Sequence, residues 1–198
     1  MTGPRRTDTE DKRALKQALR REILARRRQW PPGVLARSAE RVRAALVPVV
    51  TGRRCAAYVP VGAEPGGDGL VEALAAAASM LLLPVLRADA DLDWAAYAGS
   101  LAPATRGLSE PVGPLLGVDA IGAAEVVVVP AVAVDRRGIR LGRGGGSYDR
   151  ALTRVGDGAV VVALLYDGEL VDRLPAAPHD RTVNAAVLPS DGWVALPR

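Results

Sequence analysis

The sequence predicts an α/β protein with a mainly parallel sheet that is covered on both faces. Two observations lead to this fold class. Several runs of strand length, including residues 80–86, 125–129 and 159–166, are apolar almost throughout rather than alternating, which is typical of parallel strands buried on both faces. Segments with helical patterning separate such runs, and strands that alternate with helices form a mainly parallel sheet.

The chain is expected to begin with two helices. Residues 11–29 carry a branched apolar residue at every fourth position with no interrupting Gly or Pro, at Leu15, Leu19 and Ile23. The Trp-Pro-Pro-Gly run at residues 30–33 ends this helix. A second helix is expected over residues 34–46, with Val42 and Leu46 facing inward.

The later elements follow from short apolar runs and the turn residues between them. Strands are expected at residues 54–59, 80–86, 92–98, 125–129, 159–166 and 185–188. The strand at residues 185–188 is expected to be the last one in the chain. Helices are expected at residues 70–79 and 147–155, and residues 103–117 are expected to be irregular. Residues 1–9 are expected to form a disordered tail and residues 10–198 a single domain.

Composition excludes several classes of protein. The chain has 49% apolar residues, enough for a core, and one cysteine and one histidine, Cys55 and His179. It therefore has no intrachain disulfide, no Cys-based zinc site and no His-pair metal site, and little room for a Ser-His-Asp hydrolase. No apolar stretch reaches the roughly 18–20 residues needed to span a bilayer, so we expect a cytoplasmic protein without a membrane partner.

The N-terminal segment is strongly basic within a chain of net charge +4. Such a run attracts polyanions, whether a nucleotide, a polyglutamyl tail, RNA or a membrane surface. Charge alone favours the simpler interpretation of a solvated helix face. An RNA-binding module is a weak alternative, because only Trp30 lies near enough to supply the stacking that such modules use.

The most informative segment is the glycine-rich run at residues 140–150. Four glycines fall within five residues, at Gly142, Gly144, Gly145 and Gly146, and they leave the backbone open to a ligand. Exposed amides and two arginines, Arg140 and Arg143, suit phosphate oxygens, and Asp149 suits a magnesium ion. The spacing matches neither the P-loop nor the dinucleotide pattern. Composition alone leaves a phosphate loop and a plain surface loop equally open.

Ligands of such folds bind beyond the carboxyl ends of the strands. Three segments hold that position, at residues 60–69, 130–146 and 166–180.

The glycine segment closely resembles the R-L-G-x-G-x-G-[YF]-Y-D-R signature of the 5-formyltetrahydrofolate cyclo-ligases. Five further segments resemble elements of that family in the same order, at residues 12–16, 58–64, 106–111, 129–138 and 174–180. Each is weak alone, but together they extend the resemblance from Lys12 to about Val187.

The resemblance implies a three-layer αβα fold with a mixed, largely parallel sheet, like that of sugar isomerases and CoA-transferases. It also implies ATP-dependent and Mg²⁺-dependent closure of 5-formyltetrahydrofolate, with or without a polyglutamyl tail, to 5,10-methenyltetrahydrofolate. ADP and phosphate are the other products. In this chemistry the formyl oxygen attacks the γ-phosphate of ATP, and N10 then displaces phosphate as the ring closes. A monomer without a nucleic-acid partner is expected.

The resemblance also assigns site residues. ATP would contact Lys12, Arg13, Lys16, Arg140, Gly142, Arg143, Gly144, Gly145, Gly146, Ser147 and Tyr148. Folate would contact Pro60, Glu64, Arg143, Gly144, Gly145, Gly146 and Ser147. Magnesium would be held by Asp149 and Asp180. The catalytic side chains would be Lys12, Arg143 and Tyr148.

The residues themselves leave other interpretations open. Lys12 and Lys16 lie roughly 40° apart on a helical wheel, beside the apolar stripe, whereas most of the arginines point elsewhere. Without the family they are more ordinarily lysines at the margin of a core helix, and Glu64 is more ordinarily a turn carboxylate. Ser147 replaces the family's usual aromatic residue and Lys16 its usual arginine, so a diverged paralogue that binds ATP without cyclo-ligase activity is the alternative.

Overall fold

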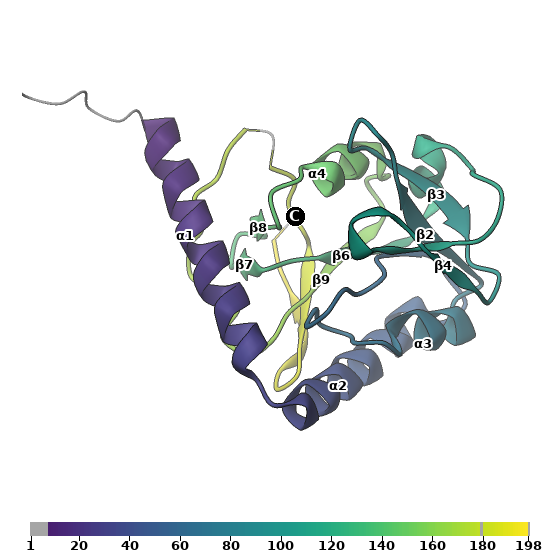
Figure 1. The fold of residues 1–198 in the computed structure, drawn as a ribbon, viewed down its shortest axis with the longest axis horizontal. Helices are drawn as coiled ribbons and strands as arrows, with labels where there is room; N and C mark the ends of the chain where they lie inside the picture. The colour runs from purple at the N-terminus through teal and green to yellow at the C-terminus, as the bar shows by residue number, and fades with distance from the viewer. Residues whose placement is uncertain (1–7, 179, 198) are drawn as a thin grey trace, which may run out of the picture.

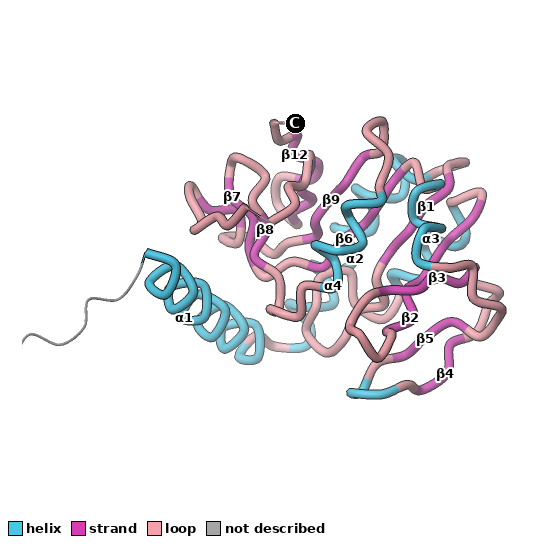
Figure 2. Tube along the Cα trace, turned by 90° about the horizontal axis from the view of Figure 1, so that it is seen from above, coloured by secondary structure: helices cyan, strands magenta, loops and turns pink. Residues whose placement is uncertain are grey.

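The computed structural model describes residues 8–178 and 180–197 and contains a mixed sheet of seven strands in the order β12-β11-β9-β6-β1-β2-β3 (Figures 1 and 2). The inner strands β11, β9, β6, β1 and β2 run parallel, and the edge strands β3 and β12 are antiparallel to their neighbours. The strands are β1 (Arg54–Ala57), β2 (Met80–Leu86), β3 (Leu92–Ala96), β6 (Val126–Pro130), β9 (Val160–Leu164), β11 (Ala185–Leu188) and β12 (Gly192–Ala195). The predicted fold class is confirmed.

Helices cover both faces of this sheet. Helices α2 (Pro32–Val50) and α3 (Leu70–Ala77) pack on one face through Val42, Leu46 and Leu74, which are fully buried. The other face is covered by α4 (Ser147–Ala151) and the 3₁₀ turns η2 (Val118–Ala123) and η3 (Leu152–Arg154). Both faces of the inner strands are therefore buried, which explains why their sequences are apolar throughout.

Helix α1 (Asp8–Gln29) packs on a separate small sheet of β10 (Leu170–Val171), β7 (Ala133–Asp135) and β8 (Arg140–Leu141). Ile23 is its buried anchor, but Leu15 is 52% exposed. The prediction that Leu15 belongs to a buried stripe is wrong, because the apolar packing of α1 on the small sheet begins at Leu19.

The predicted elements differ from the observed ones mainly at their ends. The second helix runs to Val50 rather than to residue 46, and the strand after it ends at Ala57 rather than at residue 59. The expectation that residues 185–188 form the last strand is wrong, because β12 follows. Two further strands, β4 (Leu101–Pro103) and β5 (Ser109–Pro111), pair on either side of the turn η1 (Thr105–Gly107). Of these, β5 and the last residue of β4 fall in the segment expected to be irregular. Such short strands carry no periodic signal.

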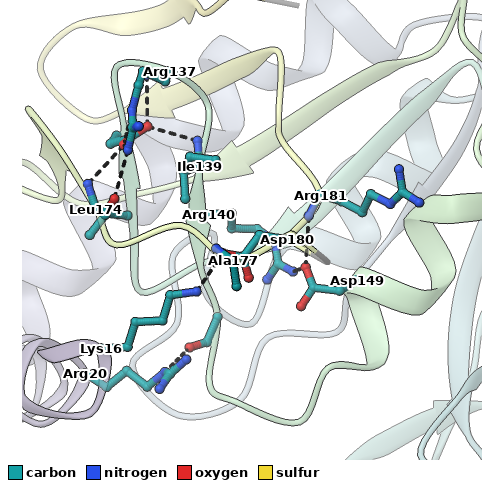
Figure 3. Close-up of polar contacts among 12 residues, drawn as sticks. Lys16, Arg20, Arg137, Ile139, Arg140, Asp149, Leu174, Ala177, Asp180 and Arg181 are labelled. Atoms are coloured by element: carbon teal, nitrogen blue, oxygen red, sulfur yellow. Dashed lines mark hydrogen bonds and ion pairs between the residues drawn. The ribbon is translucent and has the colours of Figure 1, made fainter. Parts of the chain in front are cut away.

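The hairpin from β7 to β8 is fixed by Asp135, a fully buried carboxylate. It accepts hydrogen bonds from the backbone amides of Leu174, Ile139 and Arg137 and from the Arg137 guanidinium (Figure 3). Burial alone would raise the pKa of Asp135, but these hydrogen bonds outweigh it and the pKa lies below its ordinary value. The hairpin is thereby held in place at the start of the glycine segment.

The predicted tail falls mainly on residues 1–7, which lie outside the described residues, as does His179. Within the described part of the chain, no helix combines the length and apolarity needed to cross a membrane.

Candidate functional site

Three loops meet where the parallel strands β9, β6 and β1 end. These strands are neighbours in the sheet and parallel, so their carboxyl ends lie at one edge. They lead into residues 165–169, 131–132 and 58–64 respectively, which overlap the segments predicted to bind ligands. The glycine segment runs from β8 to α4 beside them (Figure 1).

The glycine segment has a conformation that side chains would obstruct. Gly144 and Gly146 have φ values of +105° and +73°, in the region that favours glycine. A Cβ on Gly142 would lie 2.6 Å from the Arg140 guanidinium. Among the described residues, none accepts a hydrogen bond from the amides of residues 143–147. These amides are available to a ligand, as a phosphate loop requires.

Arg140 and Asp149 form an ion pair at the two ends of this segment. The Arg140 Nη2 lies 2.8 Å from the Asp149 Oδ1, and the guanidinium is almost fully buried. Arg140 also donates to the Pro130 carbonyl, at the end of β6. The pair ties the start of α4 to the sheet edge, close to the loop amides.

Lys16 and Asp180 form a second ion pair, between α1 and the segment before β11. The Lys16 Nζ lies 2.6 Å from the Asp180 Oδ2, which also accepts the Ala177 amide (Figure 3). Both side chains are largely buried. The structure thus brings the predicted ATP-binding lysine to the predicted metal-binding carboxylate.

Arg143 and Glu64 form a third ion pair, across the mouth of the site. The Arg143 Nε lies 2.8 Å from the Glu64 Oε1, and Glu64 is only 8% exposed whereas Arg143 is 53% exposed. The turn that carries Glu64 is rigid, because the Tyr58 hydroxyl donates to the Pro65 carbonyl and the Val61 amide donates to the other Glu64 oxygen. Glu64 is therefore a fixed, nearly buried carboxylate, and its partner Arg143 is a long and exposed side chain. A ligand that donates hydrogen bonds to Glu64 could take the place of the arginine.

The Tyr148 hydroxyl is buried and has no hydrogen-bond partner among the described residues. Burial raises the pKa of this hydroxyl well above its ordinary value, and the negative charge of Glu64 raises it further. The hydroxyl is therefore a neutral donor at physiological pH. A buried polar group without a partner costs stability, so it marks a place where a bound molecule would supply one.

Asp149 and Asp180 are suitable for a magnesium ion that also contacts phosphates. Both carboxylates interact electrostatically with the Arg20 guanidinium. Among the described residues, no group of three or more acidic, His or Cys side chains could hold a metal by itself. Mg²⁺ is ordinarily held by one or two carboxylates together with substrate phosphates, and this pair fits that pattern.

Other predicted residues take less central positions. Lys12 and Arg13 are exposed near the amino end of α1, and Pro60 is half-buried just after β1. Ser147 is half-buried at the start of α4.

Arg20 and Arg27 are exceptions to the expectation that most of the arginines point elsewhere than Lys12 and Lys16. The Arg20 Nε donates to the Gly142 carbonyl at 2.6 Å. Arg27 is buried against Glu169. Arg20 follows Lys16 by four residues and Arg27 follows Ile23 by four, so helical spacing places each on the face of α1 that packs on the domain and was a signal for both.

The fold and this arrangement are those of an α/β protein whose candidate site lies at the carboxyl ends of parallel strands. A model of the 5-formyltetrahydrofolate cyclo-ligase family matches residues 12–189. The chain belongs to this family, as its sequence motifs predicted, and is a ligase of folate metabolism.

Individual relatives agree with this assignment. A 5-formyltetrahydrofolate cyclo-ligase of Mycolicibacterium smegmatis is 44% identical over 188 residues, 91% of this chain and 97% of that protein. An Escherichia coli K12 cyclo-ligase is 31% identical over 151 residues, 74% of this chain and 83% of that protein.

Solved structures share the fold. The NMR structure of 5,10-methenyltetrahydrofolate synthetase from Aquifex aeolicus matches with a TM-score of 0.79 at 26% identity, over 93% of this chain and 94% of that one. A Mycoplasma pneumoniae 5,10-methenyltetrahydrofolate synthetase, 20% identical, matches in fold with a TM-score of 0.68, over 86% of this chain and 96% of that one.

Proposed function

We propose that this enzyme converts 5-formyltetrahydrofolate to 5,10-methenyltetrahydrofolate, with ATP and Mg²⁺, at the carboxyl ends of β1, β6 and β9. The observation that carries the proposal is the glycine segment with its available amides, bordered by three pairs of a cation with a carboxylate. The pairs are Lys16 with Asp180, Arg140 with Asp149, and Arg143 with Glu64.

The two substrates are assigned to opposite sides of the glycine segment. The triphosphate lies against the amides of residues 143–147 and against Lys16 and Arg140, since oriented amides and cations together bind phosphate oxygens. The pterin ring lies at Glu64, whose carboxylate accepts hydrogen bonds from ring N–H groups. Arg143 lies between the two sites and reaches both.

The residues serve phosphoryl transfer by position and charge. The formyl oxygen on N5 attacks the γ-phosphate and becomes a leaving group, and N10 then attacks the formyl carbon as phosphate departs. Charge spreads over the phosphoryl oxygens during transfer, so fixed cations and N–H donors stabilise the transition state. Arg143 supplies such a cation, and the neutral Tyr148 hydroxyl donates a hydrogen bond to the reacting oxygens. Lys12, at the amino end of α1, is assigned to the phosphates as well.

Asp149 and Asp180 would hold the magnesium ion, which neutralises phosphate charge when it is bound. Their present partners, Arg140 and Lys16, are the cations assigned to the phosphates, so the carboxylates and cations exchange partners on binding. We also propose a monomer in the cytoplasm; the single buried thiol, Cys55, suits a reducing compartment.

The test is an absorbance assay for methenyltetrahydrofolate with purified protein, 5-formyltetrahydrofolate and Mg-ATP. Product that depends on ATP is expected. Glu64→Gln is expected to raise the KM for folate at least tenfold, since a charge-assisted hydrogen bond is lost. Glu125→Gln is the matched control, because Glu125 pairs with Arg54 in the open at the opposite ends of the strands. ATP binding without any product would instead establish the diverged paralogue.

A further inference from the structure

Arg20 holds the glycine segment from outside the family signature. It lies on α1 one turn after Lys16 and donates from Nε to the Gly142 carbonyl at 2.6 Å (Figure 3). Its guanidinium carbon lies 3.8 Å from where a Cβ of Gly144 would be, so the segment folds closely against this side chain. No other hydrogen bond of the Arg20 side chain involves a described residue.

The hydrogen bond fixes the direction of one loop amide. The peptide bonds of the described chain are trans, and in a trans peptide the C=O and the following N–H point in opposite directions. Because the Gly142 carbonyl is directed at Arg20, the amide of Arg143 points away from α1. A peptide next to flexible glycines would otherwise turn freely.

The charge of Arg20 belongs to the same site. Its guanidinium interacts electrostatically with Asp180, Asp149 and Arg140, three of the residues assigned to metal and phosphate. Lys16 is a point charge on a flexible stem, whereas Arg20 presents a rigid planar fork. Arg20 therefore supplies, one turn later, the planar group that Lys16 lacks.

We propose that Arg20 is a positioning residue for nucleotide binding: it orients the Gly142–Arg143 peptide so that the Arg143 amide faces the phosphates. This inference rests on the proposed function, because it takes the glycine segment as the ATP site. It assigns to α1 a role in shaping the loop in addition to the contacts of Lys12 and Lys16.

The experiment compares Arg20→Ala, Arg20→Lys and the control Arg21→Ala, at the neighbouring exposed position of the same helix. Steady-state kinetics give the KM for Mg-ATP, the KM for folate and kcat, and thermal unfolding gives Tm. Arg20→Ala is expected to raise the KM for Mg-ATP roughly tenfold or more, because the lost hydrogen bond has a charged donor. The KM for folate stays within about twofold, and Arg20→Lys restores part of the ATP affinity because lysine keeps a charged donor.

Two results would overturn the inference. One is an unchanged KM for Mg-ATP in Arg20→Ala. The other is an equal rise in both KM values with a fall in Tm, which would show that Arg20 only docks the helix. If the wild type makes no product, calorimetric titration with Mg-ATP separates the claims: weaker binding by Arg20→Ala than by wild type supports the inference while cyclo-ligase activity fails. A wild type that binds no nucleotide defeats both.

Discussion

The docking of α1 depends on one buried ion pair, and removing one of its partners is expected to destabilise the whole protein. The Arg27 and Glu169 side chains are 2% and 0% exposed. They meet in two parallel hydrogen bonds, Nε to Oε1 at 2.8 Å and Nη2 to Oε2 at 2.6 Å. Arg27 also donates to the Ala131 carbonyl, and Glu169 accepts the Tyr166 amide. Glu169→Gln would leave a buried guanidinium without a countercharge.

The expected loss is about 3–5 kcal/mol of the free energy of unfolding, as for other buried pairs that lose one partner. This is a large share of the roughly 5–15 kcal/mol that stabilises a folded domain. At about 2–4 °C per kcal/mol for a chain of this length, the Tm falls by roughly 6–20 °C. Urea unfolding followed by circular dichroism measures the difference.

Two comparisons make this prediction strict. The double variant Arg27→Met with Glu169→Gln should be more stable than Glu169→Gln alone, because no unpaired charge stays buried. Asp172→Asn, which breaks an exposed pair with Arg136, should change stability by less than about 1 kcal/mol. The reasoning is refuted if Glu169→Gln lowers the free energy of unfolding by less than about 1 kcal/mol. It is also refuted if the double variant loses as much stability as Arg27→Met and Glu169→Gln lose together.

Other perturbations test the backbone, the pH response and the site. Gly138→Ala should lower the free energy of unfolding by more than about 2 kcal/mol, because its Cβ would overlap the Val183 carbonyl oxygen at a φ of +82°. Gly52→Ala, also at positive φ but with open space around it, should lower it by only about 1 kcal/mol, as measured by urea unfolding. The pKa of Asp135 is lower in the folded protein, so its stabilising charge is fully present above its unfolded pKa of about 4 and is lost as pH falls through the folded value. Asp135→Asn should therefore destabilise the protein at pH 7. Urea titrations should show that the difference in unfolding free energy between wild type and variant shrinks toward about pH 2; a difference that stays the same would contradict this prediction. Tyr148→Phe should leave Tm unchanged or raise it, since the removed hydroxyl has no partner, while activity falls at least tenfold; a fall in Tm would refute this.

The sequence was sufficient for the fold class and the family, because both depend on long or ordered signals. The run of valines at residues 126–129 predicted a buried parallel strand, and the glycine signature predicted the loop. Strands β7, β8 and β10 were missed, since two or three residues show no period. Their pairing is determined by tertiary contacts such as those of Asp135.

The contacts within the site were harder to predict than its residues. Arg27 and Glu169 are 142 positions apart, and one sequence contains no signal that joins them. A helical wheel places Arg20 on the same face as Lys16, but it does not show which of the many arginines donates a hydrogen bond to a backbone carbonyl. The pairing of Arg143 with Glu64 was also not predicted, because each had been assigned to a ligand rather than to the other.

The three ion pairs around the glycine segment balance three cations with three carboxylates, and Arg20 adds one further positive charge. A triphosphate that arrives without its metal would take the cations and leave two carboxylates facing four negative charges. A metal that arrives alone would take the carboxylates and leave the cations repelling one another and the metal. The complex of metal and triphosphate compensates the cations and the carboxylates of the site at once. The proposed site therefore selects Mg-ATP as a unit, through the balance of charge rather than through shape.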